Sequence, residues 1–222
     1  MQVRQLLCHT AALPDQRVEA FLGTADRTTP AVLSALTRIT ALGGPPGVAY
    51  AYSGAGYICL AVVVERAAAE PLPEFAEPRT FAPLAMNSTR YWPEPTPPGA
   101  APLAAPHPAP LSLGDGGVWS TASDLLRWGQ ALNADELGVC RLMETPGRLD
   151  DGTPLDYAWG MGIRSFGGYR VHRHGGGWPS LRALLARVPD LDSSLVIIAL
   201  ADDSERRVDL ASVVLGLVTT SG

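Results

Sequence analysis

The chain has 222 residues, of which 46% are hydrophobic and 18% are charged, so it can bury a sizeable core and disorder is not expected. Its net charge of −5 comes from 22 acidic and 17 basic residues without a long run of either sign, which disfavours nucleic acid and anionic membrane surfaces as partners. All 17 basic residues are arginine, and an arginine pKa above about 12 prevents it from replacing lysine as a proton shuttle.

Short helices are predicted near the N-terminus, over Val3–Leu7 and over 30–42, with a turn at 13–15 between them. The apolar segment 58–64 has no polar face and predicts a buried helix of about sixteen residues that begins after the N-cap Ser53 and stops before Pro71. A membrane crossing needs roughly 20 apolar residues, so we expect no membrane span.

Residues 72–84 predict another helix. The proline-rich segment 93–110 predicts a surface loop or connector, because proline sustains neither helix nor sheet. A tight turn at 114–117 precedes a further helix, which Thr121 and Asp124 open with the spacing of a capping box. The inward side of this helix is predicted to consist of Leu125, Leu126, Trp128 and Leu132.

The C-terminal third of the sequence has the pattern of short strands separated by glycine-rich and Pro-Asp turns. The predicted strands are 162–166, 169–173, 181–188 and 194–201. Their spacing predicts an antiparallel meander, and a final helix over 205–218, capped by residues 202–204, is expected to cover one face of the sheet. The predicted fold class is α+β, in a single domain that spans residues 1–222.

The three cysteines, Cys8, Cys59 and Cys140, are far apart and show no C-x-x-C spacing. The sequence therefore predicts buried free thiols, with neither a disulfide framework nor a zinc site, and we expect no cofactor. The first ten residues lack the long apolar segment and the cleavage site of a signal peptide. As it stands, the chain is expected in the cytoplasm; a segment missing before Met1 would leave export undecided.

Two segments carry residues suited to chemistry: Tyr52-Ser53-Gly54, at the mouth of the buried helix, and the run His174-Gly175-Gly176-Gly177. A phenol can relay protons, and glycines let backbone N–H groups approach a ligand closely as half of an oxyanion hole. Each segment alone has an ordinary explanation. A tyrosine before a helix usually belongs to the core, and a glycine run beside a histidine usually forms a hairpin turn.

Five segments, in this order, resemble the family of class C serine beta-lactamases, DD-peptidases and related esterases. They are VRQLLCHT (3–10), PGVAYAYSGAGY (46–57), FAPLAM (81–86), GGVWSTASDL (116–125) and HGGGWPSLRALLARVP (174–189). The resemblance covers essentially the whole chain and implies a two-lobed fold with the site between the lobes. We expect a mainly helical lobe over 1–110, including the loop 93–110, and a lobe of helix and antiparallel sheet over 111–222.

In that family, a serine within a Ser-x-x-Lys element attacks a beta-lactam, D-Ala-D-Ala peptide or ester carbonyl, and water then cleaves the acyl-enzyme. By position, Tyr52 matches the family tyrosine that activates the nucleophile as a phenolate or proton relay, and His174 matches the lysine or histidine of the strand motif. The implied partner is a small acyl substrate, an amide or ester. Contact with the substrate or oxyanion is implied for Ser53, Gly54, Gly175, Gly176 and Gly177.

This sequence departs from the family pattern in two respects. Gly54 stands where the family has asparagine, and a lysine-free sequence contains no Ser-x-x-Lys element. The family places that element upstream of the segment that matches 3–10. The chain is therefore expected to lack the first strands of the sheet and the nucleophile helix, and to be inactive on its own. Uncovered core surface and a free sheet edge would favour self-association.

Alternatives to an incomplete serine hydrolase stay open. Gly54 favours a degenerate module that binds peptides or glycans without turnover, or a structural remnant without a ligand. His172 and His174 also form a His-x-His pair that would share one face of a strand, the geometry of metal ligands. No acidic or thiol ligand is spaced near this pair, and we expect no metal site.

Overall fold

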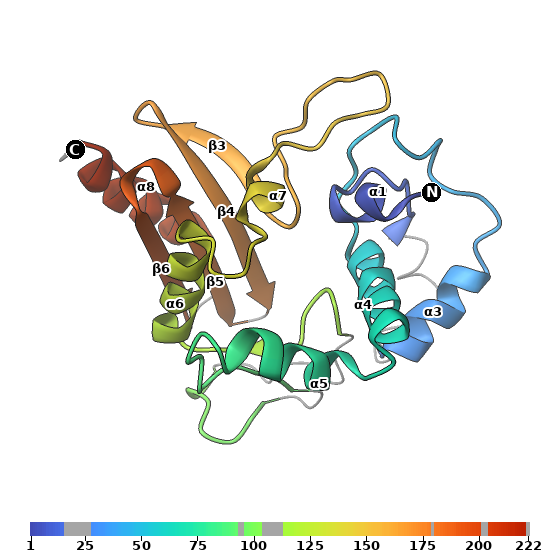
Figure 1. Ribbon diagram of the computed structural model, residues 1–222, viewed down its shortest axis with the longest axis horizontal. Coiled ribbons are helices and arrows are strands. Elements are labelled where there is room, and N and C mark those ends of the chain that lie inside the picture. The colour runs from blue at the N-terminus through green and yellow to red at the C-terminus, as the bar shows by residue number, and fades with distance from the viewer. Residues whose placement is uncertain (16–27, 93–95, 104–112, 179, 201–203, 221–222) are drawn as a thin grey trace.

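The computed structural model describes residues 1–15, 28–92, 96–103, 113–178, 180–200 and 204–220. Its elements form two groups (Figure 1). One group contains helices α1 (Val3–Leu7), α3 (Thr29–Thr37) and α4 (Gly54–Ala68). The other contains a four-stranded sheet with helices α6 (Ala122–Asn133), α7 (Cys140–Glu144) and α8 (Ser204–Thr220). This combination of helices and antiparallel sheet confirms the α+β fold class. The predicted boundary between 110 and 111 lies outside the described residues.

The connection between the two groups contains a helix that changes from α-helical to π-helical structure. Helix α5 (Leu72–Ala76) continues directly into a π-helical turn, Glu77–Phe81. Pro78 lies in this turn and has no N–H to donate, which suits a break in the α-helical hydrogen bonds. The helix predicted over 72–84 is thus present, but it is not a regular α-helix throughout. A short ladder that the sequence did not predict follows, between β1 (Arg90–Tyr91) and β2 (Val118–Trp119).

The sheet is the predicted antiparallel meander, in the order β3-β4-β5-β6. Its strands are β3 (Gly162–Phe166), β4 (Tyr169–Trp178), β5 (Leu181–Val188) and β6 (Ser193–Ala199). The predicted end of the second strand at Arg173 is wrong. The three glycines that follow His174 do not form a turn; they lie within β4, paired with Ala183 and its two neighbours on β5. Glycine weakens a strand without preventing it, and here the pairing with β5 prevails.

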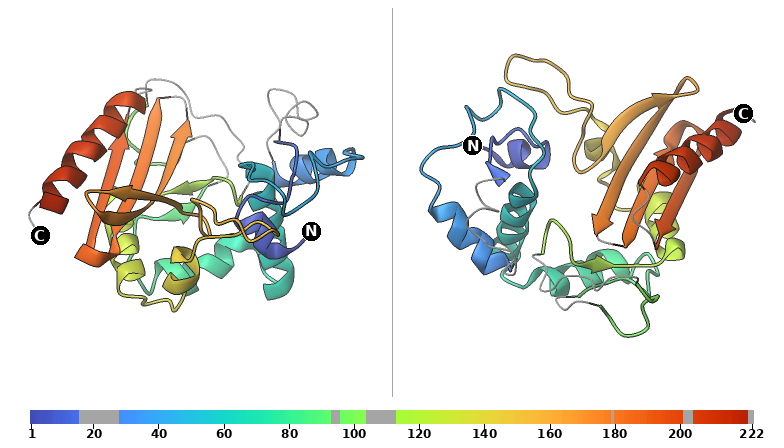
Figure 2. Two further views of the ribbon diagram at one scale, coloured as in Figure 1. Left: turned by 90° about the horizontal axis from the view of Figure 1, so that it is seen from above. Right: turned by 180° about the vertical axis from the view of Figure 1, so that it is seen from behind.

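Helices cover both faces of the sheet (Figure 2). Leu215 of α8 packs on one face against Val171, Ala186 and Val188, as predicted for the final helix. Gly129 of α6 lies on the opposite face, against Ser194 and Leu185. Among the described strands, β6 pairs only with β5, so its outer edge has no strand partner. The predicted cap at 202–203 lies outside the described residues.

Helix α4 begins and ends as the sequence predicts. The Ser53 hydroxyl accepts a hydrogen bond from the Gly56 N–H at 3.1 Å, and the helix closes at Ala69 in a left-handed conformation. The helix is not buried on all sides, however. Its buried residues are Ala55, Gly56, Ile58 and Ala61, whereas Val63 is 43% exposed. None of the described helices combines the length and hydrophobicity that crossing a membrane requires.

Two other helices differ from their predictions. Helix α3 stops at Thr37, so the predicted end at residue 42 is too late. Helix α6 has the predicted N-cap, since the Thr121 hydroxyl accepts from the Asp124 N–H at 3.2 Å. Leu126, expected on its inward side, is exposed, because the helix turns the small residue Gly129 toward the sheet instead. Cys8 and Cys140 are buried free thiols as expected, and Cys59 is half-buried.

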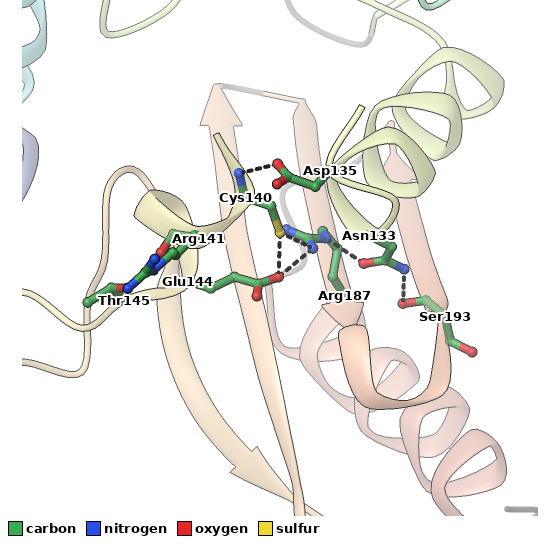
Figure 3. Close-up of polar contacts among 8 residues, drawn as sticks. All are labelled: Asn133, Asp135, Cys140, Arg141, Glu144, Thr145, Arg187 and Ser193. Carbon is green, nitrogen blue, oxygen red and sulfur yellow. Dashed lines mark hydrogen bonds and ion pairs between the residues drawn. The ribbon is translucent and has the colours of Figure 1, made fainter. Parts of the chain in front are cut away.

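A buried arginine ties α6 and α7 to the sheet (Figure 3). The Arg187 guanidinium on β5 is fully buried and pairs with Glu144 of α7 at 2.7 Å. Its Nε donates to the Asn133 side chain of α6 at 2.8 Å. The Cys140 thiol also lies within hydrogen-bonding distance of the Glu144 carboxylate, at 2.9 Å. A cation without water around it depends on such partners, so Glu144 is expected to contribute to stability.

Replacing Glu144 with alanine should lower the free energy of unfolding by about 2 kcal/mol. This value lies between the losses typical of surface ion pairs and of fully buried ion pairs, because Glu144 is 27% exposed while its partner is buried. The matched control is Glu70→Ala. Its partner Arg79 is half exposed, and this change should have an effect of at most about 1 kcal/mol. Urea denaturation of both variants measures the difference. Equal losses would contradict this role of the buried pair.

Candidate active site

Tyr52 and His174, predicted from distant parts of the sequence, line the same two cavities in the structure. The larger cavity has a volume of about 660 Å³ and is also lined by Tyr50, Tyr157 and Arg164. The smaller cavity has a volume of about 360 Å³ and is largely apolar. Its walls include Leu125, Trp128, Met143, Met161 and the single carboxylate Asp115. The two side chains therefore stand at a junction between a wider, more polar space and a narrower apolar one.

The five predicted substrate-contact residues divide between positions inside and outside these cavities. Gly175 lines both cavities, and Gly54 and Gly176 line the smaller one. Ser53 and Gly177 line neither of the two. Ser53 is only 3% exposed, and its hydroxyl already serves as the cap of α4.

His174 has a defined ring orientation. Its Nδ1 lies within hydrogen-bonding distance of the Gly160 carbonyl oxygen. A carbonyl only accepts hydrogen bonds, so Nδ1 carries the proton and the Nε2 lone pair of the neutral ring is left to act as a base. The ladder between β3 and β4 ends at the pair Gly162 and Arg173. Beyond it, no described strand covers this edge of β4, where Gly175 and Gly176 line the cavities.

Tyr52 is an uncharged phenol at neutral pH. Its side chain projects into the cavities and is 58% exposed. Partial burial raises the pKa of Tyr52, and the carboxylates of Asp115 and Asp15 raise it further. A negative phenolate is disfavoured beside these two acids. In this environment the phenol can donate or relay a proton, but it does not stand ready as a phenolate base.

Asp15 holds the turn that presents Tyr52. Its carboxylate accepts hydrogen bonds from the Ser53 hydroxyl at 2.5 Å and from the Gly54 N–H at 2.6 Å. A side chain at position 54 would approach Asp115, whose carboxylate oxygen would lie 3.3 Å from the added Cβ. Two acids thus flank Gly54, the position at which the sequence resemblance implies an asparagine. No local motif predicts this role of Asp15, because its distance from Ser53 along the chain fits none.

His9 lies directly beneath the turn and is not among the predicted site residues. Its ring is 2% exposed and lies 4.2 Å from the Tyr52 ring, between centroids. Nδ1 accepts from the Ser53 backbone N–H at 3.1 Å, and Nε2 lies 3.1 Å from the Tyr157 hydroxyl. Burial lowers the pKa of His9 to about 4, with a further contribution from His174. His9 is therefore a neutral ring at physiological pH.

The histidine pair considered as a metal site gains no further ligand from the part of the chain that the structure describes. His172 is 1% exposed, and burial lowers its pKa. His174 is engaged with Gly160. Within the described ranges, no three or more side chains of histidine, cysteine, aspartate or glutamate come together to hold a metal ion.

Comparison with known proteins agrees with this fold. The Bacillus subtilis (strain 168) penicillin-binding protein 4* is 28% identical over 233 aligned residues, which include 89% of this chain. A penicillin-binding protein structure from Bacillus halodurans superposes with a TM-score of 0.78 at 24% identity, over 95% of this chain and 71% of that one. The D-amino acid amidase of Ochrobactrum anthropi SV3, complexed with D-phenylalanine, gives 0.73 at 22% identity, over 92% and 73%.

The chain spans 51% of the length of the B. subtilis protein. The profile of the beta-lactamase family matches residues 1–218, nearly the whole sequence. The resemblance seen in five separate sequence segments is thus confirmed. The chain belongs to the beta-lactamase family.

Proposed function

We propose that residues 1–222 form the tyrosine- and histidine-bearing part of a serine acyl-hydrolase site. The observation that carries this proposal is that Tyr52 and His174 line the same two cavities. The nucleophilic serine and its lysine lie outside these residues, since the sequence has no lysine and spans about half of its curated relative. On its own the chain is then inactive.

Each group has a defined part in the proposed reaction. The external serine attacks the carbonyl carbon and gives its proton to the lysine, and Tyr52 passes the proton to the departing amine or alcohol. Backbone N–H groups at the glycine edge of β4 stabilise the oxyanion. His174 orients the phenol or the substrate from the opposite wall. Water then cleaves the acyl-enzyme by the reverse proton path.

The proposed substrates are small amides or esters. The similar structures include an amidase complexed with D-phenylalanine and a penicillin-binding protein, so D-amino acid amides and beta-lactams are the first compounds to test. The smaller cavity offers Trp128, Met143 and Met161 to an apolar group. Its apolar walls also suit the packing of the external segment that carries the nucleophile.

A second candidate function is binding without turnover. Gly54 removes the amide that the family uses to hold the substrate, and two carboxylates flank this position instead. A truncated chain would still be expected to keep the asparagine. A degenerate module that binds peptides or glycans in the same cavities explains the glycine directly.

Turnover assays separate these functions. The chain, and a form extended by the residues encoded upstream of Met1, are incubated with a chromogenic cephalosporin, a nitrophenyl ester and D-phenylalanine amide. We expect product only from the extended form. Thermal stabilisation by these compounds without turnover in either form would favour the binding module. Turnover by the 222-residue chain would contradict the proposed division of the site.

Self-association is also proposed for the chain alone. Leu210, Val213 and Leu217 of α8 are 51%, 61% and 65% exposed and follow a helical spacing of three and four residues. Together with the outer edge of β6, which pairs with no further strand among the described ones, they present exposed apolar surface. Sedimentation velocity should show concentration-dependent oligomers, which Val213→Glu weakens. A monodisperse monomer with a cooperative thermal transition would contradict this expectation.

A further inference from the structure

The buried His9 ring occupies a central place in the site, although no part of the proposed reaction requires it. Tyrosines surround it on several elements. Tyr50 and Tyr52 lie in the segment before α4, Tyr57 lies on α4, and Tyr157 lies before β3. The only other titratable neighbour identified among the described residues is His174 of β4, which disfavours protonation of His9. All of these groups are uncharged when the histidines are neutral.

The hydrogen bonds of His9 fix its tautomer. The Ser53 N–H is a donor, so Nδ1 must accept, and the neutral ring therefore carries its proton on Nε2. Nε2 then donates to the Tyr157 hydroxyl. Tyr157 in turn donates to Tyr57, whose own hydroxyl donates to the Leu7 carbonyl at 2.9 Å. One continuous series of hydrogen bonds thus runs from the Tyr52-Ser53 turn through His9 to the backbone of α1.

We propose that His9 is a positioning residue, which fixes the Tyr52-Ser53 turn through its Nδ1 and anchors that turn to α1 through Tyr157 and Tyr57. This inference rests on the proposed function, because it assigns to His9 the placement of the phenol that relays the proton. The histidine does not contact the substrate. It acts through the backbone of Ser53 and through the face of the Tyr52 ring.

Two features of the structure go beyond simple packing. His9 adopts a left-handed backbone conformation, with φ of 55°, which is uncommon for a residue other than glycine and turns the ring toward the turn. Both ring nitrogens are engaged, with a different partner on each side. A residue that only filled space would not need this donor and acceptor pattern.

Three substitutions distinguish the hydrogen bond at Nδ1 of His9 from the hydrogen bond at Nε2. Asparagine places an oxygen close to the position of Nδ1, so His9→Asn retains the acceptor for Ser53 and also tolerates the left-handed backbone. Glutamine reaches the position of Nε2, so His9→Gln retains the contact with Tyr157 and loses the acceptor. Tyr157→Phe removes the distal partner without changing residue 9.

The readout is the ¹⁹F resonance of Tyr52 in the 222-residue chain labelled with 3-fluorotyrosine, assigned by its loss in Tyr52→Phe. We expect His9→Asn and Tyr157→Phe, which both break the hydrogen bond between Nε2 and Tyr157 but keep the acceptor for Ser53, to move this resonance slightly. His9→Gln loses that acceptor and should move the resonance further and broaden it. Melting temperatures are measured in parallel. An unchanged resonance in all three variants, or equal changes in His9→Asn and His9→Gln, would overturn the positioning role.

The test is independent of catalysis. If the extended form turns over, His9→Gln should reduce kcat at least tenfold while KM changes less than threefold, and His9→Asn should retain most of kcat. If the extended form shows no turnover, the proposed function fails, whereas the ¹⁹F result still decides the role of His9. Should His9→Gln not fold, His9→Asn and Tyr157→Phe decide it: similar small changes in both support the role, and a large change in His9→Asn, or no change in either variant, overturns it.

Discussion

Replacing Tyr52 with phenylalanine in the extended protein should slow acylation by roughly 10²-fold, the lower range of a general acid–base contribution. The change removes only a hydroxyl that stands at the junction of the two cavities. Because burial, Asp115 and Asp15 raise the pKa of Tyr52, the group acts as a phenol. The rate of the unmodified protein should therefore show no ionisation of Tyr52 near neutral pH. Single-turnover kinetics with a chromogenic cephalosporin measure both effects.

Tyr50→Phe is the matched control for this prediction. Tyr50 is two residues away, lines the larger cavity and contacts the edge of the His9 ring, but it does not line the smaller cavity. Its loss should change acylation less than about tenfold, below the range of a proton-relay contribution. Similar effects of the two substitutions would show that the aromatic surroundings matter more than the phenol of Tyr52.

Acidification should destabilise the fold through His9. The pKa of His9 is about 4 in the folded protein and near 6.5 in the unfolded chain. Above pH 6.5 both states are neutral and the histidine has no pH-dependent effect. Between pH 6.5 and 4 only the unfolded chain takes up the proton, so stability falls by about 3 kcal/mol, and below pH 4 this contribution is constant. Burial lowers the pKa of His172 as well, which adds a loss of the same sign.

The variant His9→Asn isolates this contribution, since the carboxylates and His172 titrate in both proteins. The difference in unfolding free energy between the unmodified chain and His9→Asn should shrink by about 3 kcal/mol between pH 7 and pH 4. Urea denaturation at several pH values gives this difference. A pH-independent difference would mean that His9 is not held in its neutral form.

Much of the fold was predictable because its signals are local. Ser53 and Thr121 cap helices where hydroxyl residues are expected, and the strand pattern of the C-terminal third predicted the sheet topology. The errors arose where tertiary contacts override local preference. The glycines after His174 extend β4 because β5 pairs with them, and Leu126 is exposed because Gly129 lies closer to the sheet.

The candidate site was predictable only in part, for a similar reason. Tyr52 and His174 belong to segments that resemble a family, so their positions could be compared with its motifs. Asp15 and Tyr157 have no such signal, and they reach the site only through long-range packing. The role of His9 also has no signal in the sequence, where the residue resembles an ordinary buried turn histidine. Its two hydrogen-bond partners lie far from it along the chain.

Intact-protein mass spectrometry after exposure to penicillin tests the division of the site most directly. The extended form should gain the mass of one penicillin on a serine outside residues 1–222, whereas the 222-residue chain should keep its mass. Peptide mapping locates the modified residue. A stable penicilloyl adduct on any side chain of the 222-residue chain would contradict the account.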